Sequence, residues 1–480
     1  MKVFPSFFFT VVFEMIHNNL DDTICAIATA LSPSGLSVIR VSGKDSIGVV
    51  DKMFKSVKEG FCLENVDSHS IHYGYIVDNS GKTVDEVLVL VMRAPRSFTA
   101  EDTVEIDCHG GIFVTEYILN LCINNGARLA DPGEFTKRAF VNGRIDLSAA
   151  EAVCDLINAK NDFAHDSAMD QVKGRLYDEI SLLRDEIITD TAFIEAALDD
   201  PEHYLVDGFS EILGRNVDKW VDKVCSFVNK SRSGMLLKEG ISTAIVGKPN
   251  VGKSSIFNLL CGRQRAIVTD IPGTTRDVLD TQVRMGQIIL NITDTAGIRD
   301  ADDEVEKIGV EKSREMIQKA DLVLFVCDVS GKIDDADRDI FNKLHGVPVI
   351  VLANKCDTGS NIYSLNELSN EFGEGVPIIL FSAMTGSGLD ELENKILKMF
   401  FEGNLNYNDE VTVTNIRQVN ALKKCLESLG KVKESILMNM EEDFFTIDLM
   451  DAYNALGEIT GETAGDDLID NIFGKFCMGK

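Results

Sequence analysis

The sequence predicts a multidomain fold of the α/β plus α class, in which an N-terminal α+β domain is followed by a helical domain that an inserted α/β domain splits in two. The chain has 480 residues, which corresponds to about three domains of roughly 150 residues each. The spacing of apolar residues changes along the chain between strand-like and helical periods, which separates these domains. The composition, with 45% hydrophobic and 26% charged residues, is that of a folded globular protein.

The chain begins with an apolar run, Val3 to Phe13, that is much shorter than the roughly 20 residues of a membrane span. No small-residue cleavage site follows it, and the first arginine is Arg40, so neither a secretory signal nor a mitochondrial transit peptide is indicated. We expect that Met15 is the natural start and that residues 1–14 are an upstream extension. Residues 1–21 as a whole are predicted as an N-terminal extension ahead of the first domain. No association with a membrane is predicted.

Charge and cysteine content narrow the class of protein further. The chain has 47 Lys and Arg against 77 Asp and Glu, a net charge of −30, which excludes a chain-wide cationic coat that attracts a nucleic-acid backbone. Its 11 cysteines are scattered and contain no CxxC pair, so neither a disulfide framework nor a zinc knuckle is indicated. The expected location is the reducing cytoplasm.

The N-terminal domain is predicted over residues 22–133. Here the β-rich stretches Ser37 to Val41, Glu86 to Met92 and Thr103 to Asp107 alternate with turn signals, as in a compact α+β domain. Residues 134–237 are predicted as the first part of the helical domain, because apolar side chains then recur at helical spacing.

The inserted domain is predicted over residues 238–402. From Ile241 short apolar strands alternate with helical segments, which is typical of a parallel sheet with crossover helices. Residues 403–480 are predicted as the second part of the helical domain, since Val419 to Ile436 restores the helical period. We expect the helices on both sides to form one bundle.

The inserted domain carries a phosphate-binding loop. Residues 247–254, GKPNVGKS, match the pattern GxxxxGK[ST] and follow an apolar strand that ends at Val246. Glycines allow backbone N–H groups to close on the phosphates, and Lys253 is expected to reach the outer phosphate oxygens. The Ser254 hydroxyl is expected to hold Mg²⁺.

Three further motifs follow in the order found in GTPases. In the segment DTAG, Asp294 is expected to hold the Mg²⁺ shell through water. In NKCD, which follows an apolar strand, Asp357 can accept hydrogen bonds from N1–H and the 2-amino group of guanine, a donor pair that adenine lacks. Ser382 and Ala383 resemble the SA[KR] loop that meets the guanine carbonyl, with Met384 in place of the usual cation. The four motifs together predict GTP as the nucleotide.

The position that orients the attacking water in Ras-like switches departs from their pattern. Those proteins have a glutamine directly after DxxG, whereas this chain has Ile298, which cannot orient water. Either hydrolysis is very slow or another residue acts. The loop of residues 269–277 supplies Thr275 for Mg²⁺ and is polar enough to surround a monovalent cation. The predicted GTP contacts are Asn250, Val251, Gly252, Lys253, Ser254, Ser255, Thr269, Asp270, Ile271, Pro272, Gly273, Thr274, Thr275, Asp294, Thr295, Ala296, Gly297, Asn354, Lys355, Asp357, Ser382, Ala383 and Met384.

Taken together, several segments resemble the MnmE (TrmE) family of tRNA-modification GTPases, and the similarity extends from Asp22 to Lys480. These segments are VIRVSG, FTAEDTVEIDCHGG, PGEFTKRAFVNGRIDLSAAEAV, DIPGTTRD, DTAGIRDADDEVEKIG and EITGETAGDDLIDNIFGKFCMGK. The resemblance implies an N-terminal α+β folate-binding domain, a split helical domain and an inserted Ras-like P-loop GTPase domain. It also implies a homodimer that K⁺ activates.

For the GTPase site, the resemblance implies that Lys253 and Glu306 are catalytic, with Glu306 orienting water through a relay. It implies K⁺ ligands at Asn250, Thr269, Ile271 and Thr274. A cation there would stabilise charge between the β- and γ-phosphates, as an arginine finger does in other GTPases.

For the N-terminal domain, the resemblance implies a reduced folate bound by Arg40, Glu105, Arg144 and Lys480. A carboxylate suits the donors of the pterin ring and cations suit the glutamate tail of folate. Family members commonly have lysine at the position of Arg144, and the two cations are not interchangeable. For Cys477, the family match implies a reactive thiol, whereas the residue type alone indicates a small buried apolar side chain.

The function implied by the resemblance is GTP hydrolysis coupled to installing a (carboxymethyl)aminomethyl group at C5 of the wobble uridine in certain tRNAs. The folate supplies the one-carbon unit, and an FAD-containing partner, MnmG (GidA), forms a heterotetramer with the homodimer. Two alternatives remain open. A ribosome-assembly GTPase would share every GTP motif but usually carries a KH module or a second G domain, and a stand-alone folate one-carbon transferase would not need a GTP site.

Overall fold

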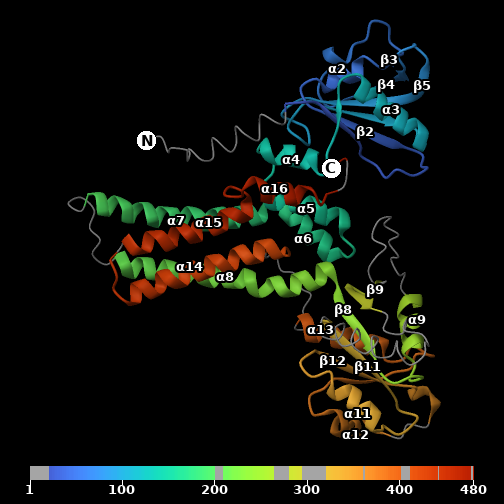
Figure 1. Cartoon of the computed structure of the whole chain (residues 1–480), viewed down its shortest axis with the longest axis vertical. Coiled ribbons are helices and arrows are strands. Elements are labelled where there is room, and N and C mark those ends of the chain that lie inside the picture. The colour runs from blue at the N-terminus through green and yellow to red at the C-terminus, as the bar shows by residue number, and fades with distance from the viewer. Residues whose placement is uncertain are drawn as a thin grey trace, which may run out of the picture. The chain divides into compact units, whose positions relative to one another are not determined.

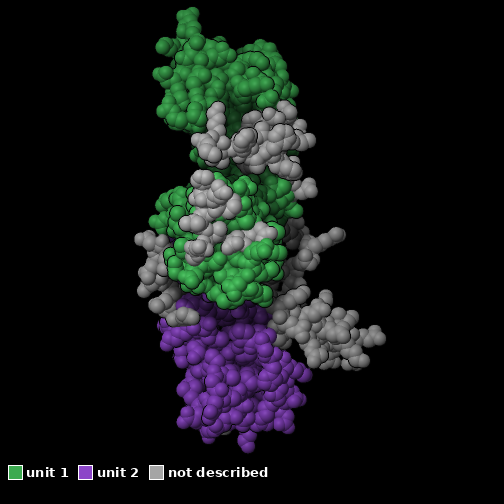
Figure 2. All heavy atoms as spheres, turned by 90° about the vertical axis from the view of Figure 1, so that its left-hand side faces the viewer, with its two compact units in different colours: residues 1–158, 168–225, 416–480 green, residues 159–167, 226–415 purple. Residues whose placement is uncertain are grey.

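The computed structural model describes residues 21–200, 209–263, 280–293, 320–359, 363–401, 411–441, 443–476 and 479. The chain forms two compact units (Figure 2). Unit 1 consists of residues 1–158, 168–225 and 416–480, and unit 2 consists of residues 159–167 and 226–415. The limits that the sequence predicts for individual domains stay predictions. None of the described helices is long and apolar enough to cross a membrane.

Unit 1 contains a seven-stranded sheet in the order β3-β4-β5-β6-β2-β1-β7 (Figure 1). Its neighbours pair antiparallel except for β1 and β7, which pair parallel. The elements are β1 (Ile24–Ile27), β2 (Ser37–Ser42), α2 (Ser46–Asp51), β3 (Phe54–Ser56), η1 (Leu63–Asn65), β4 (Ser70–Val77), β5 (Thr83–Met92), β6 (Thr103–Cys108), α3 (Ile112–Asn124) and β7 (Arg128–Leu129).

One face of this sheet packs on a hydrophobic core with α2 and α3. In β5 the alternate residues Val87, Val89 and Val91 are buried in that core, as the period of two along a strand requires. The intervening residues face the other side, where Arg40 of β2 lies directly opposite Glu105 of β6 in the strand register. The α+β character predicted for this region is confirmed.

The rest of unit 1 is helical. Helix α15 packs against both α14 and α7, so helices from both ends of the sequence share one bundle. Gly174, with φ of +83°, separates α6 from α7, within the region where apolar residues recur at helical spacing. The helices are α4 (Glu134–Val141), α5 (Leu147–Asn158), α6 (Asp162–Val172), α7 (Arg175–Asp199), α8 (Phe209–Glu239), α14 (Ile416–Leu437), α15 (Asp443–Thr460) and α16 (Asp466–Phe473).

Unit 2 is built on a six-stranded sheet in the order β13-β12-β11-β8-β10-β9. Its strands pair parallel except for the edge strand β9, which runs antiparallel to β10. The elements are β8 (Ile241–Val246), α9 (Lys253–Arg263), β9 (Asp280–Met285), β10 (Ile288–Thr293), β11 (Leu322–Asp328), α11 (Asp335–Asn342), β12 (Val349–Asn354), η3 (Cys356–Thr358), α12 (Leu365–Phe372), β13 (Ile378–Leu380) and α13 (Leu389–Phe401).

Hydrophobic cores cover both faces of this sheet, which is why strands such as β11 are apolar without interruption. Helices α9 and α13 contribute to one core, and α11 and α12 to the other. The predicted parallel sheet with crossover helices is confirmed. Because β8, β11 and β12 are parallel neighbours, the loops at their carboxyl ends meet at one edge, the usual place for a ligand in such sheets.

Candidate nucleotide-binding site

The phosphate-binding loop connects β8 to α9 in a conformation that requires glycine. Gly252 has φ of +104°, and a Cβ atom there would lie 2.2 Å from Nδ2 of Asn354. A side chain at this position would therefore meet both backbone strain and a clash. Asn250 also adopts a left-handed conformation, with φ of 62°. The loop is held in this shape by the residues around it.

Lys253 begins α9 and folds back over the loop. Its ammonium group donates to the carbonyl oxygens of Gly247 at 2.8 Å and Lys248 at 2.7 Å. The side chain is partly buried, and this burial lowers the pKa of Lys253. The residue that the sequence assigns to the outer phosphates thus lies inside the loop at the positive end of a helix, where an anion is favoured.

Asn354 joins the phosphate loop to the guanine loop. Its side-chain amide donates to the Val251 carbonyl at 2.8 Å, and its Oδ1 accepts a hydrogen bond from the backbone N–H of Ala383 at 3.0 Å. The residue is only 2% exposed. Three of the predicted motifs are therefore linked through one buried amide.

The predicted base-recognition residues lie on neighbouring loops after β12 and β13. The backbone N–H of Cys356 donates to the carbonyl of Phe381 at 3.2 Å, which pairs the two loops. Asp357 is exposed, and Ser382 is buried with its hydroxyl accepting from the N–H of Thr385. Asp357 is thus open to an incoming base, while Ser382 stabilises the loop.

Lys355 forms a contact that the sequence does not reveal. Its ammonium lies 2.5 Å from Oδ2 of Asp328 and donates to the carbonyl of Asn250 at 3.1 Å. Burial alone would raise the pKa of Asp328, but hydrogen bonds from Lys355 and Ser330 lower it overall. The only signal for Asp328 in the sequence is its place at the end of an apolar strand.

Lys248 in the phosphate loop pairs with two carboxylates of the α11 region. Its Nζ lies 2.8 Å from an oxygen of Asp334 and 2.8 Å from one of Asp337. The hydrogen bond to Asp334, followed by the one to Asp337, raises the pKa of Lys248. Asp334 also caps α11. The phosphate loop is therefore fixed to α11 as well as to β12.

Three other predicted contacts lie on the surface of the protein. Met384 is 85% exposed, and Ser254 and Ser255 are also exposed at the start of α9. In the part of the chain that is described, no group of three or more His, Cys, Asp or Glu side chains is arranged to hold a metal ion. Predicted residues that lie outside the described residues are Thr269, Asp270, Ile271, Pro272, Gly273, Thr274, Thr275, Asp294, Thr295, Ala296, Gly297, Glu306, Cys477 and Lys480.

Three of the four residues assigned to folate, namely Arg40, Glu105 and Arg144, lie near Phe98 in unit 1. Arg40 pairs with Glu105 at 2.7 Å, and its guanidinium lies 5.6 Å from the Phe98 ring centroid. Arg144 lies 5.1 Å from the same centroid and donates to the Phe98 carbonyl at 2.7 Å. The carbonyl of Gly479 lies 3.5 Å from Nη1 of Arg40. The sequence did not single out Phe98, although it belongs to the segment FTAED.

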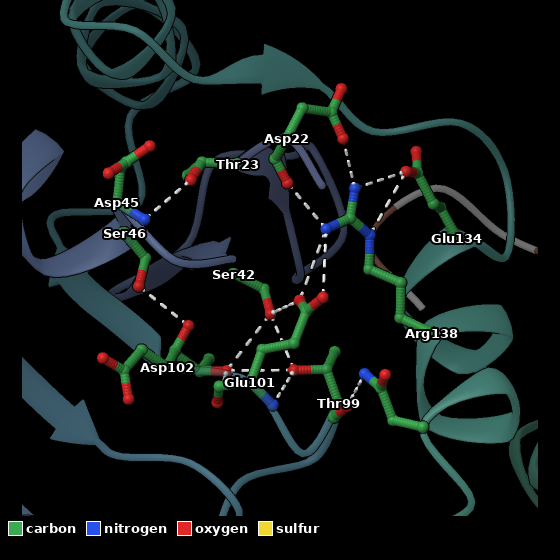
Figure 3. Close-up of polar contacts among 12 residues, drawn as sticks. Asp22, Thr23, Ser42, Asp45, Ser46, Thr99, Glu101, Asp102, Glu134 and Arg138 are labelled. Atoms are coloured by element: carbon green, nitrogen blue, oxygen red, sulfur yellow. Dashed lines mark hydrogen bonds and ion pairs between the residues drawn. The ribbon is translucent and has the colours of Figure 1, made fainter. Parts of the chain in front are cut away.

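The other end of that segment belongs to a buried ion network, drawn in Figure 3. Arg138 of α4 has no exposed side-chain surface and contacts three carboxylates. Its guanidinium lies 2.6 Å from Asp22, 3.2 Å from Glu101 and 2.9 Å from Glu134. The hydrogen bond that Asp22 accepts from Arg128, together with the weaker effect of the one from Arg138, lowers the pKa of Asp22. This network fixes the loop that carries Phe98 between β5 and β6.

Comparisons with known proteins match most of the chain. Residues 23–144 match the family described as GTP-binding protein TrmE N-terminus, and residues 147–477 match the MnmE helical domain. The chain is 50% identical over 461 residues to a tRNA modification GTPase MnmE from Lachnoclostridium phytofermentans, covering 96% of this chain and 99% of that protein.

A second relative, the tRNA modification GTPase MnmE of Lactobacillus delbrueckii subsp. bulgaricus, is 46% identical over 460 residues, which cover 96% of this chain and 98% of that protein. Among solved structures, the chain matches a variant of Era from Aquifex aeolicus bound to GDP.AlF4⁻. That match has 31% sequence identity and a TM-score of 0.28, and covers 39% of this chain and 66% of that chain.

Proposed function

This chain belongs to the MnmE (TrmE) family of tRNA modification GTPases, and from that premise we propose that it hydrolyses GTP with K⁺ activation and couples hydrolysis to modification of the wobble uridine at C5. The observation that carries the GTP assignment is the meeting of the phosphate loop, NKCD and the Ser-Ala loop around Asn354. Guanine would be recognised by Asp357 and the phosphates by Lys253 and the start of α9.

The residues near the phosphate loop fit the proposed cations. Asn250 is exposed and its backbone carbonyl accepts from Lys355, and we propose its side-chain oxygen as a ligand of K⁺. Ser254 presents an exposed hydroxyl at the start of α9, which suits Mg²⁺. Thr275 would complete the Mg²⁺ ligands, and Thr269, Ile271 and Thr274 would complete the K⁺ ligands. These cations would supply positive charge at the phosphates during hydrolysis.

Glu306 is the proposed residue that orients the attacking water. Ile298 cannot do so, because its side chain has no hydrogen-bonding group. In this proposal Lys253 stabilises charge on the phosphates and Glu306 positions the nucleophile. The two roles are separable, since one affects binding and the other affects only turnover.

The proposed folate site combines an aromatic ring with charged side chains close to it. Glu105 would accept from the pterin donors, and Arg40 and Arg144 would pair with the carboxylates of the folate tail. Phe98 offers an aromatic ring close to both guanidinium groups. The Arg40 to Gly479 contact supports a site near the C-terminal tail, where Lys480 and Cys477 are proposed to act. A bound reduced folate would supply a one-carbon unit.

The proposed assembly is a cytoplasmic homodimer that joins the FAD-containing protein MnmG (GidA) in a heterotetramer. A net charge of −30 favours an arrangement in which the partner provides most of the grip on tRNA. Opening and closing of paired G domains would link the GTP cycle to the modification reaction.

One experiment separates this proposal from the two alternatives. GTP turnover of the purified protein is measured in K⁺ and in Na⁺, and wobble-uridine modification is measured in cells that lack the chain. We expect turnover to be faster in K⁺ and the modification to be lost. Equal turnover in both salts, or intact modification, contradicts the proposal. A ribosome-assembly GTPase would leave modification intact, and a stand-alone folate transferase would not turn over GTP.

A further inference from the structure

A short segment that precedes the long helices α7 and α8 in the sequence belongs to unit 2, which carries the GTP motifs and is called the GTPase unit below. Residues 159–167 group with unit 2, while helix α6, which starts in this segment, continues into residues that group with unit 1. Phe163 is buried in the core of the unit 2 sheet together with Ile288 and Leu290 of β10. The chain therefore enters the GTPase unit and leaves it within a few residues.

Asn161 is the buried polar residue in this segment, with 4% exposure. Its Oδ1 accepts from the N–H of Ala164 at 2.7 Å, as an N-cap of α6 does. Its Nδ2 donates to the carbonyl of Leu237 at 2.7 Å and to the carbonyl of Gln287 at 3.2 Å. Capping α6 needs only the bond that Oδ1 accepts. The two bonds that Nδ2 donates are not needed for the cap and instead connect Asn161 to other parts of the chain.

Those two bonds join three separate parts of the chain. Leu237 lies in the last turns of α8, and Gln287 is in the turn between β9 and β10. Asn161 thus holds the start of α6 against the β9–β10 hairpin and against the end of the helix that enters β8.

A second set of side-chain hydrogen bonds connects the same three parts of the chain. Lys160 donates to Oε1 of Gln282 in β9, and Nε2 of Gln282 donates to Oδ1 of Asn291 in β10 at 3.0 Å. Asn291 in turn donates to the carbonyl of Glu239 at 2.9 Å. Both strands of the hairpin are therefore tied to the segment that begins α6 and to the end of α8.

The β9–β10 hairpin lies in the sequence between two stretches that carry predicted residues of the GTP site. It directly follows residues 264–279 and directly precedes residues 294–319, the two stretches that carry the predicted Thr275, Asp294 and Glu306. Loops that contact the γ-phosphate in GTPases change their arrangement when GTP is hydrolysed. If these loops shift, β9 and β10 shift with them, and so does any side chain that is hydrogen-bonded to the backbone of the hairpin, such as Asn161.

We propose that Asn161 is a positioning residue that couples the nucleotide state of the β9–β10 hairpin to helix α6, and thereby GTP hydrolysis to tRNA modification. This inference rests on the proposed function. The two amide N–H bonds carry the coupling, and the Lys160 to Gln282 bond assists it. Within the described residues, the side chain of Asn161 bonds to Ala164, Leu237 and Gln287 rather than to the phosphate or guanine loops, so we expect its loss to leave the chemistry of hydrolysis in place.

The test is Asn161→Ser in the full-length chain. Serine keeps an oxygen that can cap α6 and removes both amide donors. We expect K⁺-stimulated kcat and KM for GTP to stay within about twofold of wild type. The number of uridines modified per GTP hydrolysed should fall by about tenfold, within the range typical of coupling between sites.

The matched control is Ser364→Ala, which removes the capping box of α12 in the same unit and does not touch the hairpin. This variant should lower the melting temperature while leaving uridines modified per GTP unchanged. Lys160→Met is a second variant that keeps the apolar stem and loses the bond to Gln282. It should lower the same ratio by a smaller factor.

Hydrogen exchange of α6 supplies a readout that a purely structural role would not change. In wild type, exchange of α6 amides should differ between a non-hydrolysable GTP analogue and GDP, and in Asn161→Ser this difference should disappear. The inference is overturned if the variant keeps the wild-type ratio, or if turnover and modification fall together. Wild-type protein without modification activity would instead contradict the proposed function itself.

Discussion

Asn354→Asp is the most direct test of how the nucleotide site is held together. The substitution conserves shape and keeps an Oδ1 that can accept from Ala383, but it replaces the donor to the Val251 carbonyl with an acceptor. The two oxygens would then face each other where the amide bond is now 2.8 Å long. Because the residue is 2% exposed, water cannot replace the lost donor.

The expected cost follows from that burial. Losing one partner of a buried hydrogen bond costs about 1–3 kcal/mol. If the whole cost falls on the arrangement of the two loops, GDP and GTP affinity drops by about 5- to 150-fold. The part that does not appear in affinity should appear as a lower free energy of unfolding. Both are measured, by titration with a fluorescent GDP analogue and by denaturant unfolding.

Asn394→Asp is the matched control for this substitution. Asn394 is exposed on α13, and its Nδ2 donates to the Asp390 carbonyl at 2.9 Å. The same chemical change there should alter stability by no more than about 0.5 kcal/mol and leave affinity unchanged. Wild-type affinity together with wild-type stability in Asn354→Asp would refute the role assigned to the buried amide.

Three further predictions concern separate residues. Asp357→Asn should weaken GTP binding and allow xanthosine nucleotides to compete, because the amide presents a donor where guanine needs an acceptor; equal GTP affinity in a competition assay would count against the guanine site. Glu306→Ala should bind GTP normally and nearly stop turnover in K⁺, and normal turnover would exclude its role. His109 donates its backbone N–H to Asp85, and its Nδ1 lies 2.7 Å from the same carboxylate, which raises the pKa of His109. A raised folded-state pKa means that the pair stabilises the fold fully below the unfolded pKa and loses this effect as pH rises through the folded value. The stability difference between wild type and His109→Gln should therefore shrink as pH increases from about 5 to 8, and a constant difference in melting temperature would contradict it.

The GTPase sheet was predictable because its signals are local. An apolar run predicts each buried strand, and a motif such as GKPNVGKS follows directly in the sequence. The partners Asp328 and Asp334 were not predictable, because they meet Lys355 and Lys248 only once β11 lies between β8 and β12. Pairing across a sheet depends on strand order, which no single stretch of sequence encodes.

The residues of the proposed folate site were also only partly predictable from the sequence. The resemblance supplied Arg40 and Glu105, and the antiparallel register of β2 and β6 explains why they face each other. Phe98 was missed because a lone aromatic residue in a loop has no periodic pattern. The apolar period also does not locate the break at Gly174, since a single glycine is compatible with a continuous period until its backbone φ is known.

Arg138 has a practical consequence for anyone who wants to produce the N-terminal region alone. Its guanidinium neutralises Asp22, which precedes β1, and Glu101, which lies in the loop between β5 and β6. A fragment cut at residue 133 would keep the Arg128 that also pairs with Asp22, but it would lose the arginine that contacts Glu101. Such a fragment should be less stable than one extended through α4 to Val141, which restores the counter-ion of Glu101 within the same polypeptide.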